Sequence, residues 1–246
     1  NALEQFFIDN NDIDIIINCA AYNNVDMAEK EKNKCIMINE IAPYNLAKFS
    51  KKINAIFVTY STDFVFDGVK GMYNEDDVPG PVNYYGQTKL LAEEKVKEYA
   101  GAWCILRTVL VYGRPQQGRD NLLTLVKKKN ENGELYKVFT DQLRTPTYVE
   151  DLAKAIISVM ENKATGIFHI SGIDQLSPFQ MVIKMADLLS LNKELIIPIT
   201  KDDLKEKAIR PPYTGFDISK AKSFLNYSPV SFDEGLKKTF EIKNEN

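Results

Sequence analysis

Short apolar runs alternate with helix-like segments in the first half of the chain. Residues 13–18, 55–60 and 102–106 are three such runs, rich in hydrophobic and β-branched residues, which is typical of buried strands in a parallel sheet. Residues 27–52 and 84–99 follow the first two runs and place apolar and charged residues at helical spacing. This order predicts an α/β fold with a doubly wound, parallel, Rossmann-like sheet.

The rhythm loosens after about residue 114. We expect helices at 121–131, 149–161, 178–189 and 232–242, and strands at 136–139 and 166–170. Residues 1–140 are predicted to form the Rossmann-like cofactor-binding and catalytic part. Residues 141–246 are predicted to form a small C-terminal substrate-binding lobe, mixed with elements that close the main sheet.

Composition narrows the class of partner. The 246 residues carry a net charge of −3, with Lys and Arg interspersed among Asp and Glu, so we expect no basic face for nucleic acid. We expect no membrane contact either, because no run approaches the roughly 18 apolar residues of a span and no basic-then-apolar leader opens the chain. Cys19, Cys35 and Cys104 lack CxxC spacing, which fits free thiols in a reducing, cytoplasmic setting.

One expected feature of a dinucleotide fold is not found. Such a fold normally begins with a strand and a Gly-rich turn whose backbone amides hold the pyrophosphate, and no GxGxxG or GxxGxxG occurs in this chain. Residues 1–10 already look like the helix before the third strand of such a fold. We therefore expect the first βαβ portion to be absent from this sequence.

Positions 85–89 fit the pattern Tyr-x-x-x-Lys. On a helix, this spacing places the phenol of Tyr85 and the ammonium of Lys89 on one face, one turn apart. A nearby ammonium favours the phenolate, so we expect a lowered pKa of Tyr85 and a usable general acid. Because ligands of such sheets bind beyond the carboxyl ends of the strands, Thr62 at the end of the second run is expected in the same crevice.

A second match to the pattern, Tyr44 with Lys48, lies inside the preceding helical segment. No hydroxylic strand end leads into it, so we interpret it as packing plus a solvated lysine. The only histidine, His169, lies in a strand-like run, which favours a structural role.

Several motifs together resemble those of one enzyme family. They read Asn18-Cys19-Ala20-Ala21-Tyr22, Ser61-Thr62-Asp63-Phe64-Val65-Phe66-Asp67-Gly68, Tyr85-Gly86-x-Thr88-Lys89, Asp141-Gln142-x-x-x-Pro146-Thr147 and Arg210-Pro211. This series is similar to that of the dTDP-4-dehydrorhamnose reductases, which are extended short-chain dehydrogenase/reductases. The resemblance runs from about residue 10 to the C-terminus.

The resemblance implies NAD(P)H-dependent reduction of the 4-keto group of a nucleotide-activated 6-deoxy sugar, with NADPH or NADH as the cofactor. Thr62 would polarise the substrate carbonyl, Tyr85 would donate the proton, and Lys89 would hold the nicotinamide ribose and tune Tyr85. Other residues implied to contact the cofactor are Ala20, Ala21, Tyr22, Asn39 and Tyr60. Residues implied to contact the substrate, besides Thr62, are Asp63, Leu110, Arg144 and Arg210.

Among these residues, Asn39 would also support the catalytic helix, and the two arginines would clamp the nucleotide diphosphate by bidentate hydrogen bonds. No metal ion is implied, and a homodimer is a further expectation. Leu110 departs from the family, where a tryptophan packs against the substrate, so the particular sugar is left open.

Other activities of the same fold require different residues in this series. Sugar-nucleotide dehydratases need an Asp-Glu pair after the threonine, whereas Asp63 is followed here by Phe64, which disfavours elimination. Two alternatives stay open: a sugar-nucleotide epimerase, and a non-catalytic regulatory or binding relative. The presence of all three catalytic residue types favours an enzyme.

Overall fold

A four-stranded parallel sheet forms the centre of the molecule. The computed structural model describes residues 2–10, 12–116, 118–203 and 208–242. The sheet has the order β1-β2-β3-β8 and consists of β1 (Ile15–Asn18), β2 (Ile56–Thr62), β3 (Trp103–Thr108) and β8 (Gly166–Ile170). Each neighbouring pair in this order is parallel. The predicted α/β fold with a parallel, Rossmann-like sheet is confirmed.

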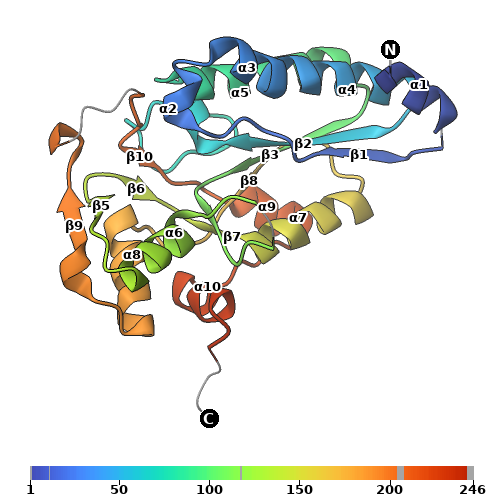
Figure 1. Ribbon diagram of the computed structural model, residues 1–246. Helices are drawn as coiled ribbons and strands as arrows, with labels where there is room; N and C mark the ends of the chain where they lie inside the picture. Colours follow the sequence, from blue (N-terminus) through green and yellow to red (C-terminus); the bar gives the residue numbers. More distant parts are fainter. Residues whose placement is uncertain (1, 11, 117, 204–207, 243–246) are drawn as a thin grey trace.

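Helices cover both faces of this sheet (Figure 1). One face carries α3 (Lys32–Ile36), α4 (Ala42–Lys52) and α5 (Tyr84–Tyr99), and the other carries α7 (Val149–Glu161) and α9 (Ser219–Leu225). α1 (Ala2–Asp9) precedes β1, and α2 (Val25–Ala28) follows it. A π-helix (Met37–Ile41) runs directly into α4, and Pro43 stands in the first turn of α4.

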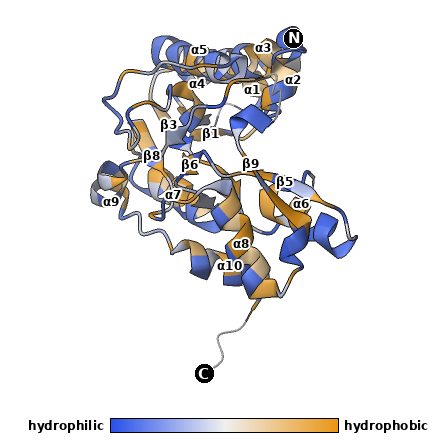
Figure 2. Ribbon diagram, turned by 90° about the vertical axis from the view of Figure 1, so that its left-hand side faces the viewer, coloured by the Kyte–Doolittle hydropathy of each residue, from blue (hydrophilic) through white to orange (hydrophobic). Residues whose placement is uncertain are grey.

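A second group of elements lies beside the sheet, in the lower part of Figure 1. It contains α6 (Leu122–Glu131), α8 (Pro178–Leu189), α10 (Phe232–Thr239) and the parallel pair β5 (Tyr136–Phe139) and β9 (Ile196–Ile199). Buried side chains of these elements, among them Leu123, Met181 and Leu236, form one apolar cluster. Figure 2 shows α8 and α10 with both blue and orange segments, as expected of helices that bury one apolar side.

Two shorter parallel pairs complete the described strands. They are β4 (Val111–Tyr112) with β7 (Thr147–Tyr148), and β6 (Leu143–Arg144) with β10 (Tyr213–Thr214). Three-residue 3₁₀ helices occur at Asp63–Val65, Lys193–Leu195 and Lys201–Asp203.

The chain passes between the sheet and the second group more than once. α6 and β5 precede residue 140 yet pack in the second group, whereas β8, α7 and α9 follow residue 140 yet pack in the main group. Both halves of the chain therefore contribute to both groups. The predicted division into a cofactor-binding part, residues 1–140, and a substrate-binding lobe, residues 141–246, stays a prediction.

The three cysteines are free thiols, of which Cys35 and Cys104 are buried and Cys19 is exposed. Within the described ranges, no helix is both long enough and apolar enough to cross the hydrocarbon core of a membrane.

Candidate active site

The carboxyl end of β2 and the first turn of α5 meet closely. Thr62 is the last residue of β2 and caps the following 3₁₀ helix, because its Oγ1 accepts a hydrogen bond from Phe64 N at 3.2 Å. Asn83 caps α5 through its Oδ1, which accepts from Gly86 N at 2.8 Å. A β-carbon at position 86 would lie 2.1 Å from Phe64 O, so glycine permits this close approach. The contact brings the start of α5 against the segment that follows Thr62.

Tyr85 lies beside Thr62 in this arrangement. Its phenol is hydrogen-bonded with the Thr62 hydroxyl, and its ring meets the Phe64 ring edge-on at 5.9 Å. Burial raises the pKa of Tyr85, and the hydrogen bond with Thr62 opposes that rise. The lowered pKa of Tyr85 predicted from sequence is therefore wrong for this structure, because desolvation outweighs the opposing effects. Tyr85 holds its proton at neutral pH, as a general acid must.

Lys89 lies one turn further along α5, and its side chain is buried. Its Nζ donates to Tyr60 O at 2.7 Å, and the contact of the Tyr60 backbone with the cofactor stays a prediction. Burial lowers the pKa of Lys89 to about 8, while the charge of Glu93 raises it. The ammonium form therefore predominates at neutral pH and is lost in mildly alkaline solution.

Asn39 joins the segment after β1 to α5. Its Oδ1 accepts from Tyr22 N at 2.7 Å, and its Nδ2 donates to Tyr22 O at 3.0 Å and to Thr88 Oγ1 at 3.1 Å. The side chain is fully buried in the π-helix. Asn39 thus fixes the backbone of the loop that contains Ala20, Ala21 and Tyr22 relative to the helix that carries Tyr85.

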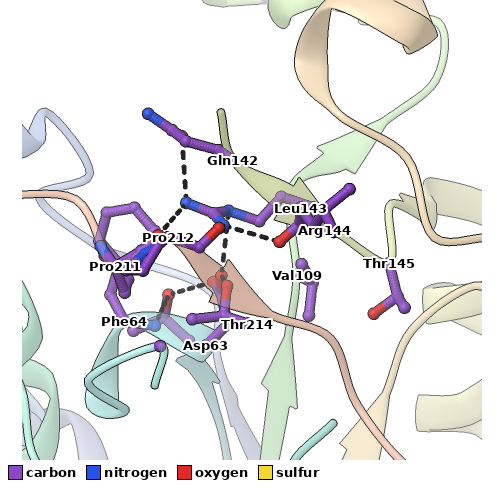
Figure 3. A network of polar contacts seen from close by, with 12 residues as sticks. Asp63, Phe64, Val109, Gln142, Leu143, Arg144, Thr145, Pro211, Pro212 and Thr214 are labelled. Carbon is purple, nitrogen blue, oxygen red and sulfur yellow. Dashed lines mark hydrogen bonds and ion pairs between the residues drawn. The ribbon is translucent and has the colours of Figure 1, made fainter. Parts of the chain in front are cut away.

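Asp63 forms a buried polar network next to Thr62 (Figure 3). Its Oδ1 accepts from Thr62 Oγ1 at 3.1 Å, and its Oδ2 accepts from Thr214 Oγ1 of β10. Arg144 Nε of β6 lies 3.7 Å from Asp63 Oδ2. Burial raises the pKa of Asp63, whereas the charge of Arg144 and the two threonine hydroxyls lower it. The network joins the carboxyl end of β2 to the β6–β10 pair.

Arg144 has a different environment from the one expected. Its guanidinium donates to the carbonyl oxygens of Leu143, Pro211 and Pro212 and to Gln142 Oε1. Because the side chain is 3% exposed and its donors bind the chain itself, this arrangement holds the strand pair together. Its predicted contact with a nucleotide diphosphate would require these hydrogen bonds to be exchanged.

Leu110 precedes β6 in the sequence, and Arg210 lies between β6 and β10. Arg210 Nη2 donates to Asp26 Oδ2 of α2 at 2.8 Å, so it ties the segment before β10 to α2. Leu110 has a φ of 30°, which is unusual for a residue other than glycine, and its partly buried side chain contacts both apolar clusters. The substrate contacts assigned to both residues stay predictions.

The second Tyr-x-x-x-Lys match lies far from this site. The Tyr44 ring meets Tyr99 edge-on at 4.8 Å, and Lys48 Nζ lies 5.1 Å from the centre of the same Tyr44 ring. Because Tyr99 is the last residue of α5, the helical rise puts it about 21 Å from the Tyr85 end. The contacts agree with the interpretation of Tyr44 as a packing residue.

Two buried charged residues next to the site were missed from the sequence. Glu93 of α5 and Arg107 of β3 are each 1% exposed and form an ion pair with an Nη2–Oε2 distance of 2.7 Å. The available signal was the spacing of Tyr85, Lys89 and Glu93 at i, i+4 and i+8, which puts all three on one helix face. His169 is fully buried and its ring stacks on Phe216 at 3.9 Å, in agreement with a structural role.

Known proteins resemble this chain over nearly its whole length. The family model described as RmlD substrate binding domain matches residues 1–244. A protein of Haloferax volcanii named probable low-salt glycan biosynthesis reductase Agl14 is 31% identical over 232 residues, covering 93% of this chain and 77% of that protein. Methionine adenosyltransferase 2 subunit beta of Xenopus tropicalis is 31% identical over 231 residues, covering 92% and 69%.

A solved structure shares the fold of this chain. The crystal structure of dTDP-4-dehydrorhamnose reductase from Bacillus anthracis in complex with NADP superimposes with a TM-score of 0.89 and 31% sequence identity. The match covers 98% of this chain and 84% of the Bacillus anthracis chain.

Proposed function

Because this chain belongs to the RmlD substrate binding domain family, we propose that it reduces the 4-keto group of a nucleotide-activated 6-deoxy sugar with NADPH or NADH. The family and fold are those of NAD(P)-dependent oxidoreductases related to dTDP-4-dehydrorhamnose reductase. The observation that carries the proposal is the meeting of Thr62, Tyr85 and Lys89 at the carboxyl end of β2. A hydroxyl, a protonated phenol and an ammonium are the groups that carbonyl reduction requires.

The residues at this end of the sheet fit the nicotinamide riboside part of a cofactor. Among the described residues, Tyr60 O is the one acceptor to which Lys89 Nζ donates a hydrogen bond. Two of the three N–H groups of Lys89 are therefore available to ribose hydroxyls. Asn39 holds the Tyr22 backbone and hence the loop of Ala20 and Ala21 in place. The Gly-rich pyrophosphate turn is not part of this sequence, so the fit concerns the ribose and nicotinamide end.

Proton transfer in this proposal begins at Tyr85. A reduced nicotinamide, when bound, would supply the hydride for the carbonyl carbon. Tyr85 would donate its phenolic proton to the carbonyl oxygen. Lys89, as an ammonium, stabilises the phenolate that remains. The product is an alcohol, and Tyr85 takes up a proton from solution before the next cycle.

Thr62 has a single hydroxyl proton and several possible acceptors. In this structure its Oγ1 lies within hydrogen-bonding reach of Asp63 Oδ1 and of the Tyr85 phenol. To polarise a substrate carbonyl, Thr62 must turn its proton from Asp63 to the substrate. Asp63 then keeps its hydrogen bond from Thr214 and its attraction to Arg144, so the exchange leaves no bare carboxylate.

A second candidate function comes from one relative. Methionine adenosyltransferase 2 subunit beta, which is 31% identical, bears the name of a subunit of an enzyme with different chemistry. A role as a binding subunit with the same fold is therefore the alternative that an assay must distinguish from a reductase. An epimerase of the same fold would also keep Tyr85 and Lys89, but it would return its cofactor in the starting redox state.

A reductase assay tests the proposal. Purified protein given a dTDP-4-keto-6-deoxy sugar should consume NADPH or NADH stoichiometrically, followed by absorbance at the reduced nicotinamide band. Tyr85→Phe should lose nearly all of that rate while its cofactor affinity, measured by fluorescence titration, is kept. Tyr44→Phe is the matched control and should keep the rate. Full activity of Tyr85→Phe, or cofactor binding without any turnover by the wild type, would contradict the proposal.

A further inference from the structure

A row of buried polar side chains crosses the sheet just before its carboxyl edge. Ser61 of β2 faces Arg107 of β3 in the strand register, and Arg107 faces His169 of β8. None of the three is more than 5% exposed. Since residues that face each other across parallel strands lie on the same side of a sheet, the row is continuous. Glu93 of α5 is the group that meets it.

The contacts of Glu93 and Arg107 satisfy both charges. Arg107 donates Nε to Glu93 Oε1 at 2.9 Å and Nη2 to Oε2 at 2.7 Å, which is a bidentate pair. Ser61 Oγ donates to Glu93 Oε1 at 2.5 Å. The third nitrogen, Arg107 Nη1, lies 3.3 Å from His169 Nε2.

His169 is neutral and acts as an acceptor for Arg107. Burial and the charge of Arg107 lower the pKa of His169 to about 3. Its Nδ1 lies 3.0 Å from Tyr73 O, and a carbonyl oxygen only accepts, so the ring hydrogen is on Nδ1. Nε2 therefore accepts from Arg107 Nη1. The network thus contains the two buried charges of Glu93 and Arg107, and Lys97 Nζ, on a half-exposed side chain, lies 3.9 Å from Glu93 Oε2.

Stability alone does not account for such a pair. Two charges lose their hydration when they are buried, and a well-packed apolar pair of similar volume is usually as stable or more stable. In some proteins a buried polar or ionic group instead defines how the elements that carry it are placed relative to one another. Here those elements are the catalytic helix and the two central strands of the sheet.

The three residues on one face of α5 each contact the last residues of β2. Tyr85 contacts Thr62, Lys89 contacts Tyr60 O, and Glu93 contacts Ser61. A rotation of α5 about its axis, or a shift along it, would break the bidentate geometry at Glu93 and move the other two contacts at the same time. We propose that Glu93 and Arg107 are positioning residues whose buried ion pair fixes the rotation and register of α5 against β2. This inference rests on the proposed reductase function of Tyr85 and Lys89.

The pair also sets the charge environment of Lys89. The groups that affect the pKa of Lys89 are Glu93 on its own helix and Cys35 on α3, both of which raise it against the effect of burial. Replacing Glu93 by a neutral residue removes an anion and leaves the Arg107 cation unbalanced, and both changes lower the pKa of Lys89 further. Replacing Arg107 leaves the Glu93 anion facing Lys89, and this change raises the pKa of Lys89.

The first experiment compares Glu93→Gln and Arg107→Met in the purified protein. Both should lower kcat by about tenfold or more through misplacement of Tyr85, with KM changed much less. The alkaline limb of the kcat profile should move to lower pH in Glu93→Gln and to higher pH in Arg107→Met. Glu94→Gln, an exposed neighbour on the same helix, is the matched control and should leave rate and profile unchanged. Shifts in the same direction, or no shift, overturn the proposal.

A second experiment separates positioning from folding. The double variant Glu93→Leu with Arg107→Met replaces the ion pair by apolar side chains, so its urea midpoint should equal or exceed that of the wild type while kcat stays low. Wild-type kcat in a folded double variant would overturn the inference. The pKa of Lys89 is measured independently of turnover by NMR of ¹³C-labelled lysine, with the signal assigned by Lys89→Arg. Opposite pKa shifts in the two single variants support the inference even if the proposed substrate is wrong, and an inactive wild type counts against the proposed function alone.

Discussion

Gly86 lies directly against the carbonyl oxygen of Phe64, so that a β-carbon at position 86 would come within 2.1 Å of it. This contact joins the first turn of α5 to the segment that follows Thr62. It sets how closely Tyr85 can approach the end of β2, because Tyr85 is the adjacent residue.

Gly86→Ala should therefore displace the start of α5. The added methyl group overpacks a backbone contact, which costs about 1–3 kcal/mol in the free energy of unfolding. Displacement of Tyr85 by about 1 Å should reduce kcat roughly 100-fold. Urea unfolding and steady-state kinetics measure the two effects. Gly80→Ala is the control, since a β-carbon there meets only Asp67 Cβ at an ordinary 3.8 Å; equal behaviour of the two variants would contradict this account.

Asn39→Asp should weaken both cofactor binding and the fold. An aspartate still accepts from Tyr22 N, but it loses the donor that binds Tyr22 O and Thr88 Oγ1. The unsatisfied groups should cost about 1–3 kcal/mol of stability. Loosening of the loop that contains Tyr22 should raise the Kd for NADPH in a fluorescence titration. Asn33→Asp, an exposed position in α3, makes the same chemical change as a control and should bind NADPH normally.

Thr214→Val should disturb Thr62 through Asp63. Removing the Thr214 hydroxyl takes away a hydrogen bond that lowers the pKa of Asp63, so the pKa of Asp63 rises further. The remaining donor, Thr62, is then held more strongly by Asp63 and is less available to a substrate carbonyl. We expect a fall in kcat of about tenfold, since one hydrogen bond to a charged group contributes about 1.5–3 kcal/mol.

Thr214→Ser restores the hydroxyl and should recover most of the wild-type kcat. The free energy of unfolding of both variants separates the loss of the hydroxyl from a loss of packing. Valine matches the volume of threonine more closely than serine does, so a packing effect would be larger in Thr214→Ser. A variant series in which activity follows volume rather than the hydroxyl would be evidence against the coupling of Thr214 to Thr62.

Helices and strands with a clear hydrophobic pattern of their own were predicted well from the sequence. The helix at 84–99 and the strand at 166–170 have the predicted bounds, because long helical periodicity and short apolar runs are local signals. The two-residue strands β4, β6, β7 and β10 were not predicted. They consist of isolated hydrogen-bonded pairs whose partners lie elsewhere in the chain, and a local pattern contains no information about such partners.

The site shows the same limit. Thr62, Tyr85 and Lys89 were predicted to converge, since strand ends of a parallel sheet share one edge. The predicted direction of the Tyr85 pKa shift was wrong, because that direction depends on how deeply the phenol is buried. The environment of Arg144 depends likewise on carbonyl groups from residues 211 and 212, which approach it only in the folded chain.

Lys89 should make activity and stability respond to pH in opposite directions. Its pKa in the folded protein is about 8, below the ordinary 10.5 of a lysine, because burial disfavours the ammonium. Activity that requires the ammonium falls as the pH rises through about 8. In the window between about pH 8 and 10.5 the unfolded chain binds more protons at this position than the folded chain, so the stability contribution of Lys89 rises with pH.

Comparison with Lys89→Met isolates this effect from the other lysines and tyrosines. Urea unfolding of both proteins is measured from pH 7 to 10, and the difference in their free energies of unfolding is plotted against pH. The wild type should gain stability relative to Lys89→Met as the pH rises through this window, while its kcat falls. A flat difference would mean that Lys89 is solvated rather than buried in the folded protein, and the alkaline loss of activity would then have to come from another group.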